Sequence, residues 1–188
     1  HTEHSTLDGI NRVETLPEYV RDELGQRSLG ITDHGVVSGT YRHYKACRQA
    51  GIKPILGMES YYAITDVGAR EKDEDGERYY HLVLLALNGE GFKNLIKLSS
   101  DAYTHNMYYK PRLVDSMLAD HASGLAATTS CLGSRFAKLI LLNRRDEAER
   151  LVQHHNEMQP ETPLPLLQPY LYHHQQSLHD QMFLYGNK

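Results

Sequence analysis

The chain has 188 residues, which is long enough for one domain with a sizeable core but short for two. Its 20 lysines and arginines face 24 aspartates and glutamates, and the resulting net charge of −4 argues against a polybasic nucleic-acid binder. No run approaches the roughly 18 apolar residues of a membrane span, and two distant cysteines argue against a disulfide scaffold and for a reducing, cytoplasmic setting. The unusual count is 12 histidines, which makes a metal site the first hypothesis.

The first half of the chain predicts helices that alternate with short apolar strands. In chain order we expect a helix that a capping-box pattern opens at Thr15 and Gly25 closes, a strand at 29–31, a helix at 40–50 and a strand at 52–56. Polar turns follow both strands, at 32–35 and at 57–59. Because the chain opens at His1 directly into a polar motif, we expect it to be a piece of a longer protein.

The second half continues the alternation as far as residue 158. We expect a solvated loop at 70–78, a strand at 81–86, a helix at 91–102 with Phe92, Leu95, Ile96 and Leu98 on its apolar face, a strand at 125–127, and helices at 135–142 and 146–158. Prolines interrupt residues 159–188, where we expect only a short strand near 170–172. Strands separated by helices indicate βα units and a mainly parallel sheet, whose chemistry lies at the carboxyl ends of its strands.

Metal-binding side chains fall at several of these predicted strand ends. Asp33, His34, Glu59 and Cys131 all follow or close a strand, while His1, His4 and Asp8 crowd into the first eight residues. Nitrogen, carboxylate and thiolate ligands together suit zinc, iron or manganese better than calcium. One carboxylate such as Glu59 would bridge two metals with one water activated between them, a common arrangement for cleaving phosphoesters.

Each of these residues also has an ordinary structural interpretation. Cys131 alone would more often be a packed core residue, and Cys47, within a helix, is expected to be packed. His81 precedes its strand, which is the wrong end in a parallel sheet unless the preceding loop turns back at the rim. We expect the following histidines to be surface or hydrogen-bonded residues: His43, His105, His121, His154 and His155.

Several stretches together resemble a known family. They are Ile-Thr-Asp-His-Gly at 31–35, Gly-Ile-Lys-Pro-Ile-Leu-Gly-Met-Glu at 51–59, and the stretches 81–86, 91–99, 108–112 and 130–133. They closely resemble the PHP (polymerase and histidinol phosphatase) domain at the amino end of bacterial or phage replicative DNA polymerase III alpha subunits. The similarity runs from His1 to about Glu149, so we expect a PHP domain at 1–158 and a poorly matched, proline-rich continuation at 159–188.

The resemblance implies a distorted (β/α)7, TIM-like barrel, incomplete in this chain, with two or three divalent ions (Zn, Mn or Fe) at its rim. Position by position, it implies six metal ligands: His1, Asp8, His34, Glu59, His81 and Cys131. It implies that Asp33 orients the site without binding metal, while His4 stands where the family is usually aromatic and is not counted. A first histidine would precede His1 by two residues, and a late Asp-x-His pair is not evident before Lys188. We therefore expect an incomplete site.

The activity implied by the resemblance is metal-dependent phosphodiester hydrolysis within a replicative DNA-directed DNA polymerase, as a 3′–5′ proofreading exonuclease. The implied partners are the primer 3′ end, the remaining polymerase domains, and a sliding clamp or a proofreading subunit. Lys110 and Arg112 are the cations that we expect at DNA phosphates. Two alternatives remain: a non-catalytic module that stabilises the polymerase and docks a separate proofreading subunit, and a free-standing PHP phosphoesterase.

Overall fold

The structure, a computed structural model, describes residues 1–6 and 8–158. Its elements in chain order are α1 (Leu16–Asp22), β1 (Ser28–His34), α2 (Thr40–Ala50), β2 (Lys53–Tyr62), β3 (Tyr80–Ala86), α3 (Gly89–His105), β4 (Met107–Tyr108), β5 (Lys110–Leu113), α4 (Asp115–Asp120), β6 (Leu125–Thr128), α5 (Arg135–Leu141) and α6 (Arg145–Glu157). The tail expected at 159–188 and its short strand lie outside the described residues.

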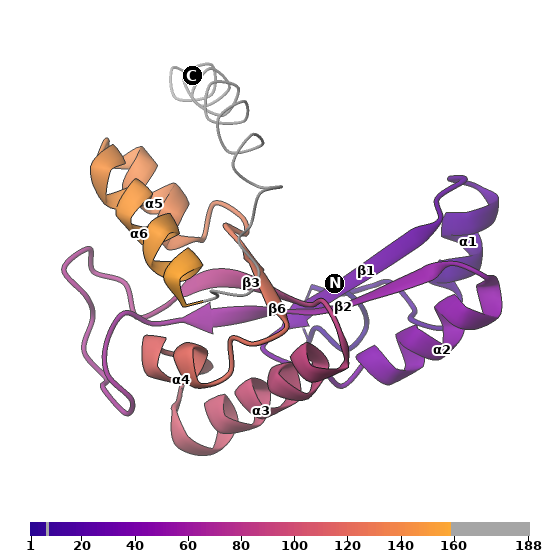
Figure 1. Ribbon diagram of the computed structural model, residues 1–188, viewed down its shortest axis with the longest axis horizontal. Coiled ribbons are helices and arrows are strands. Elements are labelled where there is room, and N and C mark those ends of the chain that lie inside the picture. The colour runs from indigo at the N-terminus through magenta and orange to yellow at the C-terminus, as the bar shows by residue number, and fades with distance from the viewer. Residues whose placement is uncertain (7, 159–188) are drawn as a thin grey trace.

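The strands form one mixed sheet around β2 (Figure 1). On one edge of β2, β1 runs parallel to it up to the pair His34–Glu59, and β5 continues that edge, also parallel, beside Tyr61 and Tyr62. On the other edge, β3 runs antiparallel to β2, β6 runs antiparallel to β3, and β4 pairs antiparallel with β5. Our prediction of a mainly parallel sheet is wrong. The chain passes from β2 to β3 through a loop with no crossover helix, so the two strands are antiparallel.

This topology brings the ends of several strands to one edge of the sheet. Since β1, β2, β5 and β6 all run in the same direction, their carboxyl ends lie at the same edge. The antiparallel β3 begins at that edge, where His81 pairs with Tyr61. The fold is therefore an α/β domain in which the carboxyl ends of several strands and the amino end of β3 bring polar side chains together at one edge of the sheet.

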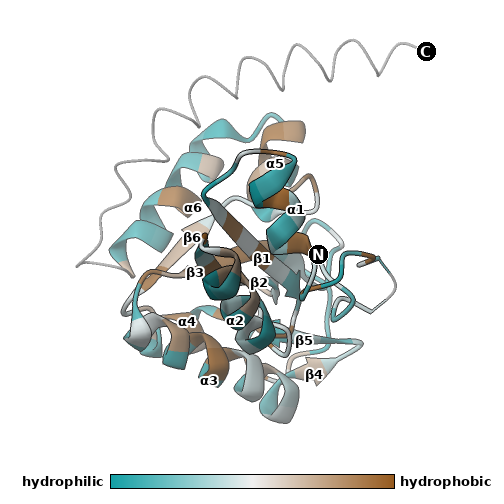
Figure 2. Ribbon diagram, turned by 90° about the vertical axis from the view of Figure 1, so that its right-hand side faces the viewer, coloured by the Kyte–Doolittle hydropathy of each residue, from teal (hydrophilic) through white to brown (hydrophobic). Residues whose placement is uncertain are grey.

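Helices cover the sheet on both sides. In Figure 1, α2, α3 and α4 lie below the sheet and α5 and α6 lie above it. The helices carry both hydrophilic and hydrophobic residues (Figure 2), as expected of helices that pack one face on a sheet. In the part of the chain that the structure describes, no helix is both long and apolar enough to cross a bilayer.

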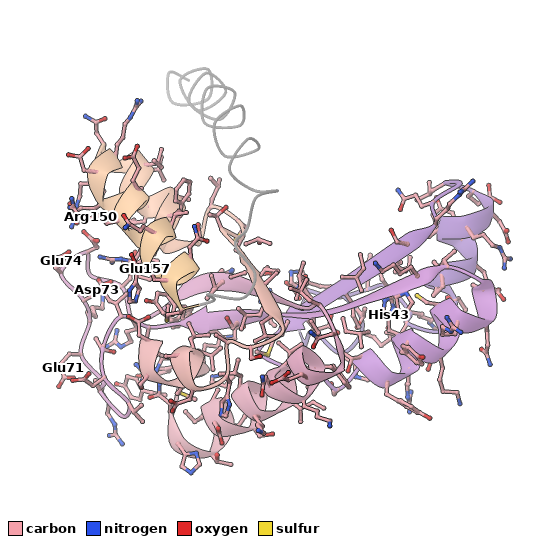
Figure 3. The ribbon with its side chains drawn as sticks, in the orientation of Figure 1. His43, Glu71, Asp73, Glu74, Arg150 and Glu157 are labelled. Atoms are coloured by element: carbon pink, nitrogen blue, oxygen red, sulfur yellow. The ribbon has the colours of Figure 1, made fainter. Side chains whose placement is uncertain are left out.

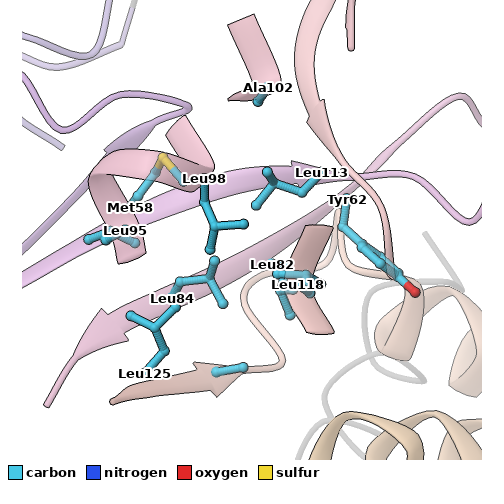
Figure 4. Packing of buried hydrophobic residues seen from close by; sticks show 11 residues of the cluster. Met58, Tyr62, Leu82, Leu84, Leu95, Leu98, Ala102, Leu113, Leu118 and Leu125 are labelled. Atoms are coloured by element: carbon cyan, nitrogen blue, oxygen red, sulfur yellow. The ribbon is translucent and has the colours of Figure 1, made fainter. Parts of the chain in front are cut away.

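The larger core lies between α3, α4 and strands β2, β3 and β6 (Figure 4). Leu95 and Leu98 are fully buried there, and each contributes roughly 2 kcal/mol of hydrophobic stabilisation. Ile96, which we expected on the same face, is 41% exposed because the residue after Leu95 is rotated by 100° around the helix. A smaller cluster of Val20, Cys47, Ala50 and Ile52 joins α1 and α2 to the start of β2.

Element boundaries largely follow the sequence signals, with some differences. Gly51 ends α2 in the left-handed conformation, with φ of 74°, as its position predicted. Thr15 precedes α1, but its side chain makes no capping hydrogen bond, so the capping-box interpretation is wrong. The sequence also gave no indication of β4, β5 and α4, which are six residues long or shorter.

The charged loop at 70–78 is largely exposed, as we expected, but several of its acidic side chains pair with cations at helices α5 and α6. The Asp73 side chain is 3% exposed, and its carboxylate lies 3.4 Å from the Arg135 guanidinium of α5. Asp75 pairs with Arg144 at 2.7 Å, and Glu77 with Lys138 at 2.9 Å. Figure 3 shows Asp73 and Glu74 beside α5 and α6. The loop before His81 is thus tied to the helices that follow Cys131.

Candidate metal centre

The residues expected to bind metal come together at the carboxyl edge of the sheet. They come from four parts of the chain: His1 and Asp8 from the first residues, His34 at the end of β1 with Glu59 opposite it within β2, His81 from the start of β3, and Cys131 from the turn after β6. Two overlapping groups have ligand atoms that all lie within 4.8 Å of one another, His1–Asp8–His34 and His34–Glu59–His81. His34 belongs to both groups.

Glu59 is the central acceptor of this cluster. Its Oε2 lies 3.0 Å from His1 Nε2, and its Oε1 lies 2.7 Å from His81 Nδ1 and accepts a hydrogen bond from Ser130 Oγ at 2.9 Å. Burial alone would raise the pKa of Glu59, but the hydrogen bonds from His81 and Ser130 and the nearby histidine charges lower this pKa to about 2. Glu59 is therefore an ionised carboxylate in the buried second half, 57–62, of a mostly apolar strand.

His34 and Asp8 form the other half of the cluster. His34 Nε2 lies 2.8 Å from Asp8 Oδ2, and the His34 ring stacks on the His1 ring with centroids 4.2 Å apart. The Nδ1 atom of His34 is buried and has no hydrogen-bond partner within residues 1–6 and 8–158. A buried nitrogen without a partner costs free energy unless a ligand or water meets it.

The donor set and its spacing fit transition-metal binding. Two ligands of one tetrahedral zinc ion lie about 3.4 Å apart, given zinc–nitrogen and zinc–oxygen distances near 2.1 Å. The imidazole–carboxylate contacts of 2.7 to 3.0 Å, and the 3.4 Å between Cys131 Sγ and His81 Nδ1, are close to that spacing. Small outward movements of these side chains would make room for ions between them. Imidazole, carboxylate and thiol donors together suit zinc, iron or manganese.

Asp33 lies next to the cluster and supports it through the backbone. Its carboxylate accepts hydrogen bonds from the Thr2 amide at 2.6 Å and from the Thr2 hydroxyl at 2.7 Å, and it is 2% exposed. Asp33 thereby fixes the segment that carries His1, and within residues 1–6 and 8–158 its side chain makes no hydrogen bond or ion pair with the six cluster residues. His4 bonds instead to Ser38, with Nδ1 3.1 Å from the hydroxyl.

The direction of β3 explains why His81 reaches the cluster. A strand parallel to β2 would begin at the opposite edge, but β3 is antiparallel, and its second residue pairs with Tyr61 near the end of β2. The loop does turn back at the rim, which was the condition for His81 to reach the site. Tyr61 fills the space beside it, with its ring centroid 5.6 Å from the His81 ring and 5.8 Å from the His34 ring.

Cys131 is exposed, so the interpretation of this residue as core packing is wrong. Its sulfur lies 3.6 Å from Glu59 Oε1 and 3.4 Å from His81 Nδ1. Ser130, which was not among the expected site residues, has φ of 57°, and this left-handed turn directs its hydroxyl to Glu59. Its only sequence signal was its position immediately before Cys131.

Of the remaining expectations, the structure confirms some and contradicts others. His43 and Cys47 are fully buried, and His43 Nε2 lies 2.9 Å from the Leu29 carbonyl, which confirms their structural roles. Arg112 was expected to meet phosphates, but it is 1% exposed and donates to the Ala69 carbonyl at 2.6 Å, so that expectation is wrong. Lys110 lies near the cluster, with Nζ 5.1 Å from the Tyr61 ring centroid.

Comparison with known proteins gives one consistent family. The model of the PHP domain family matches residues 1–162. DNA polymerase III subunit alpha of Treponema pallidum is 44% identical over 149 residues, which cover 79% of this chain and 13% of that protein. The Borreliella burgdorferi protein of the same name is 38% identical with the same coverage, and that of Aquifex aeolicus is 37% identical over 158 residues, 81% of this chain and 14% of the relative. The chain thus spans about one seventh of these relatives. The chain belongs to the PHP domain family.

Proposed function

We propose that this chain is the PHP domain of a replicative DNA polymerase III alpha subunit and that its cluster is a metal-dependent 3′–5′ exonuclease site. The observation that carries the proposal is the meeting of six donors, from residues 1 to 131, at one edge of the sheet. The relatives at 37 to 44% identity support the polymerase assignment. We further propose that the sheet belongs to a (β/α)7 barrel, and that the protein acts in the cytoplasm, which suits its two free cysteines.

The cluster residues suit two or three ions of zinc, manganese or iron. When bound, such ions would lower the pKa of an attacking water and neutralise charge on the phosphoryl oxygens. Glu59, ionised at neutral pH, offers both oxygens to neighbouring donors, and Ser130 fixes the orientation of its carboxylate. Asp8 orients the His34 ring, and Asp33 holds Thr2 so that His1 stays over His34.

The test combines metal analysis with an exonuclease assay, on this chain and on the polymerase that contains it. We expect the purified protein to hold more than one transition-metal ion and to remove 3′ nucleotides from single-stranded DNA. His34→Ala should lose at least one ion and at least about 100-fold in cleavage rate, because even the outer partners of a metal site typically contribute 10- to 100-fold. The matched control is His105→Ala, whose side chain is 68% exposed and which lies outside the cluster.

A second candidate is a non-catalytic module that stabilises the polymerase and docks a separate proofreading subunit. It is favoured by the way His1, His81 and Ser130 already occupy both oxygens of Glu59 by themselves. A metal-free protein that folds stably, or a metal-loaded protein with the same residual cleavage as His34→Ala, would support this candidate and reject the exonuclease.

A further inference from the structure

The β4–β5 hairpin lies directly against the candidate metal centre. Gly35 follows the cluster residue His34, and a Cβ atom at Gly35 would lie 2.9 Å from Pro111 of β5. From the same strand, Lys110 places Nζ 5.1 Å from the centroid of the Tyr61 ring, which in turn stacks beside His34. The tip of the hairpin is therefore next to the place where a scissile bond would lie.

Positively charged side chains gather at this tip. The guanidinium carbons of Arg70, Arg78 and Arg112 lie 5.4, 5.8 and 5.4 Å from the centroid of the Tyr108 ring. Over residues 1–6 and 8–158, no carboxylate lies within 4.0 Å of the side-chain nitrogens of these three arginines or of Lys110, although Glu71 accepts a hydrogen bond from the Arg70 backbone amide at 3.0 Å. In a chain of net charge −4, three such cations beside the Tyr108 ring, together with Lys110 beside the Tyr61 ring, favour the binding of anions here.

Not all four cations can meet a ligand directly. Arg112 is buried and its guanidinium bonds to the Ala69 carbonyl and the Asn106 side chain, so it contributes charge only. Arg70 is exposed, and Arg78 and Lys110 are partly exposed. We call Arg70, Arg78, Tyr108, Tyr109 and Lys110 the tip surface.

Tyr109 gives the tip surface an aromatic platform. It stands alone between the paired residues Tyr108 and Lys110, with φ of 59°, a conformation that glycine or asparagine adopts more readily than tyrosine. Its side chain is 74% exposed, and Arg78 lies 5.7 Å from its ring centroid. The strained turn thus holds an exposed ring next to a cation, which is the pairing that single-stranded nucleic acids meet in their binding proteins.

We propose that the tip surface binds the single-stranded 3′ segment of the DNA substrate, with a base stacked on Tyr109 and phosphates on Arg78, Lys110 and Arg70. The inference rests on the proposed exonuclease function for the nature of the ligand. It adds where the strand lies: across the hairpin tip, with its 3′ end directed past Tyr61 to the cluster. Single strands are favoured over duplex, because a base inside a duplex has no free face for Tyr109.

Fluorescence anisotropy with a labelled oligothymidine in EDTA tests this surface without any contribution from bound metal. We expect Tyr109→Ala to weaken binding roughly tenfold, the usual effect of losing one base–aromatic stack. Arg78→Gln should weaken binding and reduce the slope of log affinity against log salt by about 0.7, the value for one phosphate contact on a single strand. An abasic oligomer, which has the sugar–phosphate backbone but no bases, should bind the unaltered chain more weakly than oligothymidine does. The two oligomers should bind Tyr109→Ala with the same low affinity, because the stacking ring is absent.

The chain offers a matched control pair on α2. Lys45 Nζ lies 5.8 Å from the centroid of Tyr41, which is 68% exposed, so this pair has the same chemistry away from the hairpin. Tyr41→Ala and Lys45→Gln should leave affinity unchanged. The proposal is overturned if the unaltered chain does not bind, if the control variants lose as much as Tyr109→Ala, or if duplex binds as tightly as single strands. Failure of metal loading or cleavage would instead overturn the exonuclease proposal and leave binding in EDTA intact.

Discussion

At the scale of single residues, Glu59 is unusual because it places a charged side chain in the buried part of a strand. A carboxylate inside a buried strand is unfavourable unless donors surround it, and here two imidazoles, a hydroxyl and a thiol do so. Burial opposes the charge, but the hydrogen bonds from His81 and Ser130 and the charges of His81 and His34 outweigh it and keep the pKa of Glu59 near 2. The free energy of burying this charge is offset by the same side chains that we propose as metal ligands.

The two cysteines should differ sharply in reactivity. Burial raises the pKa of Cys47 to about 11, so at pH 8 only about one Cys47 in a thousand is a thiolate, and the residue is also fully enclosed. Cys131 is exposed. We expect one thiol per chain to react rapidly with a disulfide reagent in EDTA, and the second only on unfolding.

Substitution identifies the reactive thiol. Cys131→Ser should abolish the rapid phase, and added zinc should slow this phase in the unaltered protein because the sulfur would be occupied. Two rapid thiols, or a rapid thiol that survives Cys131→Ser, would contradict the burial of Cys47 or the exposure of Cys131.

At the scale of elements, local patterns predicted most of the helices and strands but not how the strands pair. Helix α2 and its glycine cap follow directly from residues 40–51, because periodicity and a left-handed glycine are local signals. The antiparallel direction of β3 depends on the 17 residues between β2 and β3, whose loop is fixed by contacts to helices more than 50 residues later. Such long-range contacts leave no periodic signal in the sequence.

In the loop at 70–78, the contribution of a buried ion pair to the free energy of unfolding can be compared with that of an exposed one. Asp73 accepts hydrogen bonds from Tyr80 at 2.6 Å and from the backbone amides of Asp75 and Glu77, and it pairs with Arg135. We expect Asp73→Asn to lower the free energy of unfolding by about 3 kcal/mol, because a largely buried arginine loses a partner. Urea unfolding with an unchanged m-value would measure this loss.

Glu74 supplies the matched control for Asp73. Its side chain is 63% exposed and contacts Arg135, the cationic partner of Asp73, as well as Arg144. Glu74→Gln should change the free energy of unfolding by less than about 1 kcal/mol. Equal effects of the two substitutions would show that burial does not determine the strength of this network.

His155 of α6 should make stability depend on pH. Burial lowers the pKa of His155 to about 4, while Asp115 opposes and His154 adds to this shift. Between about pH 6.5 and pH 4 the unfolded chain binds a proton that the folded chain does not, so stability falls as pH falls through this window. The expected loss is on the order of 2 kcal/mol.

The measurement is urea unfolding at several pH values in EDTA. His155→Leu should flatten the decline between pH 6.5 and pH 4, and the exposed control His105→Gln should leave it unchanged. A decline of the same size in His155→Leu would assign the acid sensitivity to other groups, such as the histidines of the cluster.

At the scale of the whole molecule, the candidate site was identified from motifs, while its geometry required the fold. The six expected ligands were named from a family resemblance, and the structure brings them within contact of one another. Sequence alone could not reveal Ser130 at Glu59, or that Arg112 points inward, because both depend on how separate strands pack. Asp33 could be placed beside the site, but its bonds to Thr2 could not be foreseen.

Because the donors come from four distant segments, metal binding should be coupled to global stability. An ion that binds only the folded chain stabilises it by about 2.7 kcal/mol at 100 times its Kd, which corresponds to a rise in Tm of roughly 5–10 °C for a chain of this size. We expect zinc or manganese to raise Tm in calorimetry, and calcium, which prefers oxygen ligands, to have little effect. His34→Ala should remove the response, and a zinc-induced rise that persists in this variant would place the ion elsewhere.

The register of β1 against β2 also has a consequence for the order of folding. His34 and Glu59 are brought opposite each other by a short βαβ unit, whereas the contacts of Ser130 and Cys131 with Glu59 close loops of 71 and 72 residues. Loops of that length form later than local units, because closing them costs more chain entropy. During synthesis, the imidazole and carboxylate donors would therefore be assembled before the thiol emerges, so the nascent chain passes through a stage that selects ions by nitrogen and oxygen alone.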